Sequence, residues 1–309
     1  MDYAIRCAGL TKRYGSRLAV HGLNLAVEPG QVFGFLGPNG SGKTTTMRML
    51  LGLVRPTSGQ AWIHGRPLPD PVGLAEIGAM IEEPGFHPWA TGRQNLELLA
   101  LSGPPLRQRE AVRVALDRVG LASDASRRVR TYSQGMRQRL GLAAALLRQP
   151  SLLILDEPIN GLDPVGIQEM RTLLGELADV GTTVFLSSHL LSEIEQVCDR
   201  VAVLHAGQLV EEGSVADLAA QHAMVRVTLG PDELPHAQQV LTGWQTHVSG
   251  PDALLVEQAD PRAVNQALGR SGLWAREIRR ERATLENRFL HLTSECRSPK
   301  DSDDAPAAR

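Results

Sequence analysis

Short apolar runs alternate with helical patterns through most of the chain. Residues 32–36 form an apolar run suited to a buried strand, and residues 44–51 place their apolar side chains on one helical face. Residues 151–155 and 183–186 are further apolar runs of strand length. Strands separated by helices are typical of an α/β fold with a parallel sheet, so we predict that these three runs share one sheet.

Two segments depart from this alternation. Residues 5–27 contain short alternating runs broken by Tyr14-Gly15-Ser16 and by His21-Gly22, which predicts antiparallel strands joined by turns. Residues 92–150 change to helical periods. We therefore expect an antiparallel β subdomain and a helical insertion, at about residues 90–150, around the α/β core.

The pattern changes again beyond residue 220. Residues 225–229 alternate between apolar and polar side chains, which predicts a strand, and Asp260-Pro261 predicts the start of a helix with proline in its first turn. Apolar residues at helical spacing over 285–292 predict another helix. We expect a domain over 1–220, a small α+β module over 221–293, and a disordered tail over 294–309, where Ser, Asp, Ala and Pro dominate.

Composition excludes several classes of protein. The net charge of −2 and the pI near 6.5 do not suit a surface that binds nucleic acid. No apolar run approaches the roughly 18 residues that span a bilayer, and residues 1–15 lack the apolar core of a signal peptide. Cys7, Cys198 and Cys296 are too scattered for a disulfide framework or zinc site, which favours reduced thiols in a cytoplasm. If the protein works at a membrane, another chain must supply the spans.

A phosphate-binding motif follows the first apolar run. Its glycines allow a tightly wound loop whose N–H groups point inward at a helix N-terminus, which makes an anion site. Lys43, one of only three lysines among 32 basic residues, would reach the β- and γ-phosphates, and the Thr44 hydroxyl would bind Mg²⁺. The motif matches G-x-x-x-x-G-K-[ST] without a mismatch and reads Gly37-Pro38-Asn39-Gly40-Ser41-Gly42-Lys43-Thr44-Thr45.

Polar residues end the other two apolar runs. The run at 151–155 closes on Asp156, whose carboxylate would hold Mg²⁺, and on Glu157, which is placed to polarise an attacking water. The run at 183–186 leads to His189, which we interpret as a contact to the γ-phosphate. Parallel strands bring their carboxyl ends to one edge of a sheet, so these residues are expected to converge with the phosphate loop on one ATP site.

Together with Tyr132-Ser133-Gln134-Gly135-Met136 and with residues 160–163, these motifs occur in a characteristic order. Over about residues 1–215 the chain resembles the ATP-binding subunit of an ABC transporter, with a P-loop NTPase, RecA-like core. The run at 132–136 is similar to the family signature LSGGQ, and its helix start suits a second anion site.

The resemblance implies that two copies of the ATP-binding chain work together as a dimer. In the family, the signature of one subunit contacts the γ-phosphate of ATP bound to the opposite subunit, so a head-to-tail homodimer with two ATP molecules is expected. ATP would close it and hydrolysis reopen it. The implied roles are hydrolysis by Glu157 with Lys43 and His189, adenine stacking by Tyr14, and nucleotide contacts from Ser133, Gln134, Gly135 and Asp163.

The chain departs from the family pattern at two places. Gln134 and Met136 stand where the signature has Gly and Gln, and Glu82 stands where the family's Q-loop has Gln. Glu82 can ligate Mg²⁺ as an amide oxygen does, while adding negative charge near the phosphates. This form, like the run at 92–96, is similar to that of bacitracin, lantibiotic and related antibiotic-resistance exporters. The alternative is that Glu82 is a surface acid and the alignment is shifted by one residue.

The expected function is to power export of an antibiotic, peptide or lipid-like compound through a separate membrane permease, at the cytoplasmic face of the cell membrane. In the family, the groove near residues 82–89 receives the permease; Phe86, Pro88 and Trp89 are either part of that contact or buried loop residues. One alternative is a soluble ABC ATPase of translation or DNA repair, which the single phosphate loop and the absence of a long inserted coiled coil disfavour. An importer subunit is the other alternative, and Glu82 weakens it.

Overall fold

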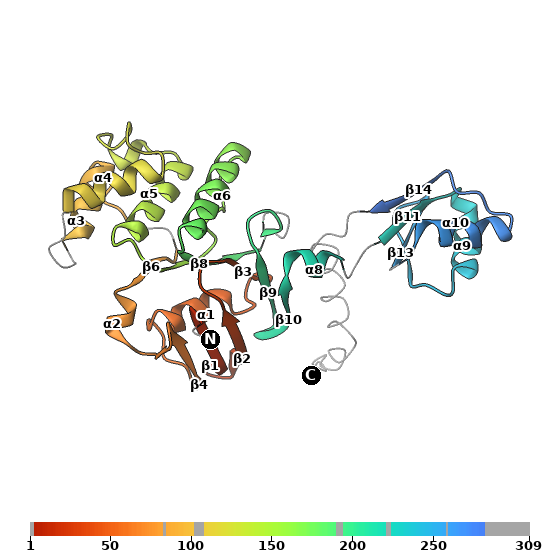
Figure 1. Ribbon diagram of the computed structural model, residues 1–309, viewed down its shortest axis with the longest axis horizontal. Helices are drawn as coiled ribbons and strands as arrows, with labels where there is room; N and C mark the ends of the chain where they lie inside the picture. Colours follow the sequence, from red (N-terminus) through yellow and green to blue (C-terminus); the bar gives the residue numbers. More distant parts are fainter. Residues whose placement is uncertain are drawn as a thin grey trace, which may run out of the picture. The chain divides into compact units, whose positions relative to one another are not determined.

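The structure is a computed structural model and describes residues 3–82, 85–101, 108–189, 194–220, 224–257 and 259–281, with only the backbone at 219 and 220. The chain divides into two units, Met1–Gly213 and Ser214–Arg309 (Figure 1). The division at Gly213 lies before the expected domain boundary at residue 220. The expected helix over 285–292 and the expected tail over 294–309 lie outside the described residues.

A six-stranded sheet forms the core of the first unit. The three apolar runs are its neighbouring strands β3, β8 and β7, which are parallel to one another and wholly buried. Burial on both faces explains why apolar residues follow one another directly in these strands instead of standing at every second position. The predicted α/β core is thereby confirmed. In sheet order the strands are β10 (Gln208–Ser214), β9 (Arg200–His205), β3 (Val32–Leu36), β8 (Thr183–Ser188), β7 (Leu152–Leu155) and β6 (Ile77–Met80).

Two helices follow the core strands β3 and β7 in the sequence. Helix α1 (Lys43–Leu50) begins directly after the phosphate loop and buries Met47 and Leu50. Helix α6 (Pro164–Asp179) lies between β7 and β8 in the sequence and starts at Asp163, whose side chain accepts a hydrogen bond from the backbone N–H of Gly166. These connections bring the carboxyl ends of β3, β7 and β8 to the same edge.

The antiparallel subdomain is a four-stranded sheet beside α1 (Figure 1). The break expected at His21-Gly22 is absent, because β2 continues through both residues and accommodates them by shifts in its pairing with β1. Gly22 has a φ of 61°, which fits a β-bulge. From the sequence alone, the same glycine predicts a turn. The sheet order is β2 (Arg17–Val27), β1 (Ile5–Tyr14), β4 (Ser58–Ile63) and β5 (Arg66–Pro67), and the short helix α2 (Pro71–Leu74) follows β5.

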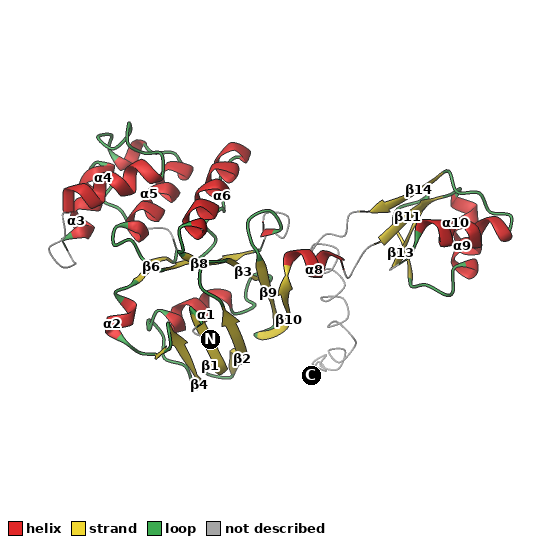
Figure 2. Cartoon of the chain, in the orientation of Figure 1, coloured by secondary structure: helices red, strands yellow, loops and turns green. Residues whose placement is uncertain are grey.

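The insertion is helical, as predicted (Figure 2). Leu96, Val112, Leu116 and Leu140 are buried in it. Leu99 is 44% exposed because it lines a groove described below. The described helices are α3 (Gly92–Ala100), α4 (Gln108–Arg118), the short 3-10 helix η1 (Val129–Thr131) and α5 (Gln134–Leu146).

The second unit has a hydrophobic core of its own. Both of its longer helices pack on one face of a four-stranded antiparallel sheet of order β12-β13-β11-β14. The succession strand, helix, strand, strand, helix, strand in this sheet order is the split βαβ arrangement of ferredoxin-like folds. After α8 (Val215–Ala220), the elements are β11 (Met224–Thr228), the 3-10 helix η2 (Pro231–Glu233), α9 (Leu234–Val240), β12 (Thr246–Val248), β13 (Ala253–Glu257), α10 (Pro261–Arg270) and β14 (Glu277–Glu281).

Two sequence expectations concern membranes and thiols. Within the described ranges, no helix combines the length and apolar character needed to cross a bilayer. Cys7 and Cys198 are buried, and burial raises the pKa of both thiols, that of Cys7 to about 12. Thiols with such raised pKa values stay protonated and unreactive. Cys296 lies outside the described residues.

Candidate functional site

The phosphate loop has a backbone that only glycine fits. Gly37, Gly40 and Gly42 have φ values of 154°, 82° and 108°. A Cβ at Gly37 would run into the carbonyl oxygen of Leu204, and one at Gly42 would lie 2.5 Å from the carbonyl oxygen of Ala19. The loop is therefore fixed against its neighbours by close backbone contact, at the N-terminus of α1.

Lys43 is held inside this loop. Its side chain is 6% exposed, and its Nζ donates a 2.7 Å hydrogen bond to the carbonyl oxygen of Gly37. Nζ also lies 3.7 Å from Oε1 of Glu157. Desolvation by burial lowers the pKa of Lys43, while the charges of Glu157 and Asp156 oppose that shift. The result is a positive charge aimed across the loop toward two carboxylates.

Asp156 follows β7 and contacts two hydroxyl groups. The Thr44 hydroxyl donates a 2.7 Å hydrogen bond to Oδ2 of Asp156, and the Ser187 hydroxyl donates to Oδ1. Ser187 also accepts a 3.0 Å hydrogen bond from the backbone N–H of Glu157. Three elements, α1, β7 and β8, thus meet at one carboxylate. Ser187 was not among the predicted site residues; its one signal is that it lies in the polar end of an apolar run.

Glu157 has a left-handed backbone, with a φ of 50°. Residues other than glycine adopt this conformation rarely and at a cost, so surrounding contacts must hold it. Its Oε2 lies 2.7 Å from Nδ1 of His189, and its Oε1 faces Lys43. The structure therefore brings the predicted residues Lys43, Glu157 and His189 into one connected group.

A hollow of about 420 Å³ opens above this group, and we call it the phosphate hollow. Tyr14 at its rim is 46% exposed, with Nζ of Lys12 lying 5.0 Å from its ring centroid. Arg17, whose guanidinium lies beside Gly40, also lines the hollow and was not predicted. The complete lining is Tyr14, Arg17, Ala19, Asn39, Gly40, Gly42, Lys43, Thr44, Thr45 and Glu157.

The hollow suits a nucleotide triphosphate with Mg²⁺. The Ser41 hydroxyl is buried and has no hydrogen-bond partner within the described part of the chain, so the loop keeps a polar group unsatisfied. Thr44 and Asp156 present neighbouring oxygens of the kind that Mg²⁺ prefers. Among the described residues, no group of three or more His, Cys, Asp or Glu is arranged to hold a metal. Phosphate and water oxygens would therefore supply the remaining ligands.

The signature residues lie at a different hollow, of about 290 Å³, which we call the signature hollow. Ser133 caps α5 and accepts a 3.2 Å hydrogen bond from the backbone N–H of Met136. Gly135, Leu162 and Asp163 line the same hollow. Two helix N-termini, those of α5 and α6, open there. None of these residues lines the phosphate hollow, so one copy of the chain does not bring its own signature to Lys43.

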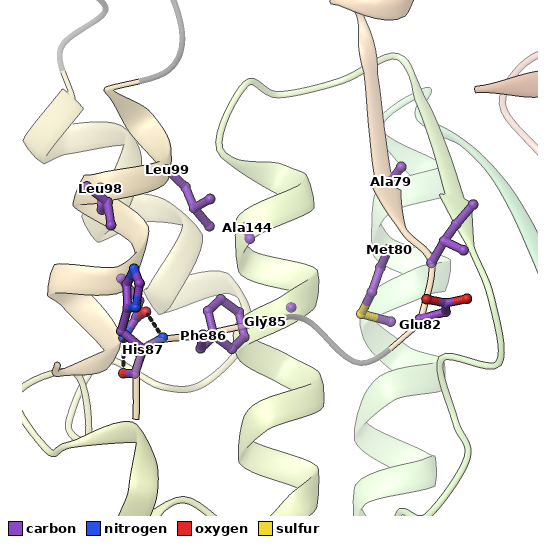
Figure 3. A pocket seen from close by; sticks show the side chains of 12 residues that line it. Ala79, Met80, Glu82, Gly85, Phe86, His87, Leu98, Leu99 and Ala144 are labelled. Atoms are coloured by element: carbon purple, nitrogen blue, oxygen red, sulfur yellow. Dashed lines mark hydrogen bonds between the residues drawn. The ribbon is translucent and has the colours of Figure 1, made fainter. Parts of the chain in front are cut away.

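Glu82 also lies apart from the phosphate hollow. Its backbone is left-handed, with a φ of 67°, and its carboxylate pairs with Arg48 on α1. Glu82 lines a groove of about 200 Å³ between β6 and the helices of the insertion (Figure 3). The structure thus does not bring Glu82 to Thr44 or Asp156, and its role as a Mg²⁺ ligand stays a prediction.

This groove, which we call the helical groove, is mostly apolar. Leu98 and Leu99 project toward it from α3 and are 50% and 44% exposed, with Phe86 below them (Figure 3). Buried Asn95 fixes its rim, because the Asn95 side chain accepts a hydrogen bond from the backbone N–H of His87 and donates one to its carbonyl oxygen. Trp89, 68% exposed, lies beside His87, with the two rings tilted by 39° at a centroid distance of 4.8 Å.

Comparison with known proteins gives a consistent picture. The model of the family described as ABC transporter matches residues 20–160. A bacitracin transport ATP-binding protein, BcrA, of Enterococcus faecalis is 46% identical over 222 residues, which cover 71% of each chain. A daunorubicin resistance ATP-binding protein, DrrA3, of Streptomyces coeruleorubidus is 36% identical over 313 residues, covering 97% of this chain and 99% of that protein. A dimeric structure of a bacterial ABC transporter cassette, MJ0796, superposes with a TM-score of 0.62 at 25% identity, covering 68% of this chain and 98% of that one.

Proposed function

The chain belongs to the ABC transporter family of ATP-binding proteins, and from that premise we propose that it hydrolyses ATP to power export through a separate membrane permease. ATP binding and hydrolysis follow from the family. The export direction is supported by the relatives, whose names describe bacitracin transport and daunorubicin resistance. An antibiotic or a compound of similar chemistry is the proposed cargo.

One observation carries the hydrolytic part of this proposal. Glu157 lies between Lys43 and His189, at the edge of the hollow that the phosphate loop lines. Its carboxylate is placed to accept a proton from water, whose oxygen attacks the γ-phosphorus while the bond to the leaving ADP oxygen breaks. Lys43 balances negative charge on the phosphates, and His189 orients Glu157.

Thr44 and Asp156 would hold Mg²⁺, which when bound neutralises charge on the β- and γ-phosphates. Their shared hydrogen bond and the Ser187 hydroxyl fix the two oxygens in place. Tyr14 is exposed at the rim, where an adenine ring can stack on its face. Arg17 lines the same hollow and adds positive charge to it. These groups bind and orient the substrate on which Glu157 acts.

A second copy of the chain is the proposed partner at the ATP site. The signature hollow carries two helix N-termini and lies outside the phosphate hollow, which suits contact with a phosphate bound by another copy. The dimeric MJ0796 cassette supports such an assembly. In this arrangement Ser133, Gln134, Gly135 and Asp163 face the ATP of the partner, and closure of the dimer depends on the γ-phosphate.

The permease is proposed to dock at the helical groove. Leu98, Leu99 and Phe86 line this groove together with Glu82. Arg48, the partner of Glu82, sits on the helix that starts at the phosphate loop. A permease segment bound there would contact the helical insertion and also the Glu82–Arg48 pair, which connects the groove to helix α1 at the ATP site. This contact would place the chain at the cytoplasmic face of the membrane.

The hydrolytic assignment is tested with Glu157→Gln in the full-length chain. The variant removes the proton acceptor while keeping side-chain size, so turnover should fall by about a hundredfold or more, and ATP affinity should be kept. Phosphate release measures turnover, nucleotide titration measures affinity, and gel filtration with ATP should show an accumulated dimer. Glu176→Gln, the same change at an exposed position of α6, is the control and should behave as the wild type. Unchanged turnover in Glu157→Gln would remove the role assigned to this residue.

A further inference from the structure

Helix α5 holds the backbone of Glu157 through one side chain. Nε2 of Gln138 donates to the carbonyl oxygen of Glu157 at 3.2 Å and to that of Pro158 at 3.0 Å. Gln138 is partly buried, so these hydrogen bonds are shielded from bulk water. We propose that Gln138 is a positioning residue that keeps Glu157 in its hydrolytic conformation.

The backbone of Glu157 requires such support. Its φ of 50° is sparsely populated for a residue with a side chain, and it persists only where neighbours fix the adjoining peptide groups. The Ser187 hydroxyl fixes the N–H side of Glu157. The carbonyl side is fixed by the backbone N–H of Asn160, at 3.1 Å, and by Gln138. Gln138 is thus the side chain that holds the carbonyl side of the strained residue.

A second glutamine of α5 lies on the same segment one turn earlier. Gly161 has a φ of 75°, and a Cβ built there would run into the amide of Gln134. The Gln134 side chain therefore packs on the backbone of Gly161, in the space that a glycine leaves. Gln134 and Gln138, four positions apart on one helical face, together brace residues 157–161. Gln134 is also one of the two positions at which the signature departs from the family pattern.

Because Gln134 and Gln138 hold residues 157–161, helix α5 acts on two ATP sites, its own and that of a second copy. This inference rests on the proposed function. The first turn of α5 carries Ser133 and Gly135, proposed to meet the phosphate bound by a second copy. One turn later, Gln138 holds Glu157 of the same chain's ATP site. A shift of α5 on opening of one site would therefore release the backbone of Glu157 in the other. Hydrolysis is then coupled to engagement of both signatures.

The test is Gln138→Leu in the full-length chain, which keeps side-chain bulk and removes the donor. We expect kcat for ATP hydrolysis to fall about tenfold, which corresponds to about 1.4 kcal/mol of transition-state free energy, with KM for ATP unchanged. The melting temperature of the nucleotide-free chain should match the wild type. A merely structural residue would instead lower the melting temperature and leave kcat of the folded fraction unchanged, and that result would overturn the proposal.

Two more variants at the same position separate donation from packing. Gln138→Lys keeps a donor of similar length and should restore kcat to within about threefold of the wild type, while Gln138→Glu presents an acceptor to two carbonyl oxygens and should be as slow as Gln138→Leu. Gln168→Leu on α6, an exposed glutamine, is the matched control and should keep wild-type kcat. Equal kcat in all three Gln138 variants would overturn the proposal. Absence of ATPase activity in the wild type would instead overturn the proposed function.

Discussion

The phosphate hollow and the signature hollow both lie at helix N-termini, yet they differ in what surrounds those termini. The phosphate hollow has a buried ammonium, two carboxylates and hydroxyl groups that contact one another across three elements. The signature hollow has helix caps at Ser133 and Asp163, and its charged lining residues Arg139 and Glu169 pair with each other; among the described residues that line it, no ammonium or carboxylate is held at a phosphate loop. The difference indicates that a helix N-terminus attracts an anion, whereas hydrolysis needs charges and a base fixed around it. The first hollow is suited to bind ATP alone, and the second to complete the site of another copy.

The largest effect is expected from Gly135→Asp, which places a negative charge in the signature hollow. A Cβ there meets the end of Leu162 at 3.2 Å and the Ser133 hydroxyl oxygen at 3.9 Å, so the side chain fits with a small adjustment of Leu162. Repulsion between the new carboxylate and the phosphate of the partner copy should cost several kcal/mol, which lowers turnover by about a hundredfold or more. ATP affinity of the separate chain should stay the same, as measured by nucleotide titration under conditions that keep the chain monomeric. If Gly135→Asp weakens ATP binding by the separate chain, the proposal that the phosphate hollow binds ATP without the signature hollow is wrong.

A smaller effect, on affinity, is expected from Lys43→Ala. The variant removes the ammonium from the phosphate hollow and leaves Glu157 and Asp156 without their buried counter-charge. Loss of a charge-assisted hydrogen bond of about 1.5–3 kcal/mol should weaken ATP binding roughly 10- to 150-fold. Titration with a fluorescent ATP analogue measures the change, and Lys12→Ala, at the rim, should weaken binding much less. Tight binding by Lys43→Ala would refute the function of the loop.

The smallest effect is expected from Tyr14→Ala. Stacking on an aromatic face contributes about 1–3 kcal/mol per base, and the 46% exposure of Tyr14 favours the lower end. ATP affinity should therefore fall about fivefold with turnover at saturating ATP unchanged, and Tyr14→Phe should match the wild type. Steady-state kinetics separate KM from kcat. A fall in kcat would show that Tyr14 does more than bind the base.

The parts of the site that sequence predicts are those with a local pattern. The phosphate loop combines fixed glycine spacing with a strand before it and a helix after it, so its place could be derived from residues 32–51 alone. Ser187, Gln138 and Arg48 could not be found this way. Their contacts join residues 19 to 34 positions apart, and which groups meet depends on how α1, α5, β7, β8 and the segment after β6 pack. The position of the Glu82 carboxylate could not be predicted either, because the left-handed backbone of Glu82 turns it toward Arg48.

The second unit shows a different limit. Strand β11 and helix α10 have the alternation and the start signal that sequence reading requires, and they are predicted. Strand β14 is not, because four of its five residues are charged. It is an edge strand, where charged side chains suit a backbone that is paired on one side only. Such strands form because a neighbour pairs with them, which a pattern of hydrophobicity does not report.

The separate core of the second unit bears on how chains of this kind change over generations. All the buried apolar residues of that cluster belong to residues 225–273, so a substitution among them alters the packing of one unit only. The nucleotide-binding unit has its own cluster, contained in residues 5–204. Mutations on the two sides of Gly213 are therefore free to accumulate separately. A boundary of this kind is a natural point for recombination, at which one cassette acquires a new C-terminal unit while its ATP chemistry is inherited intact.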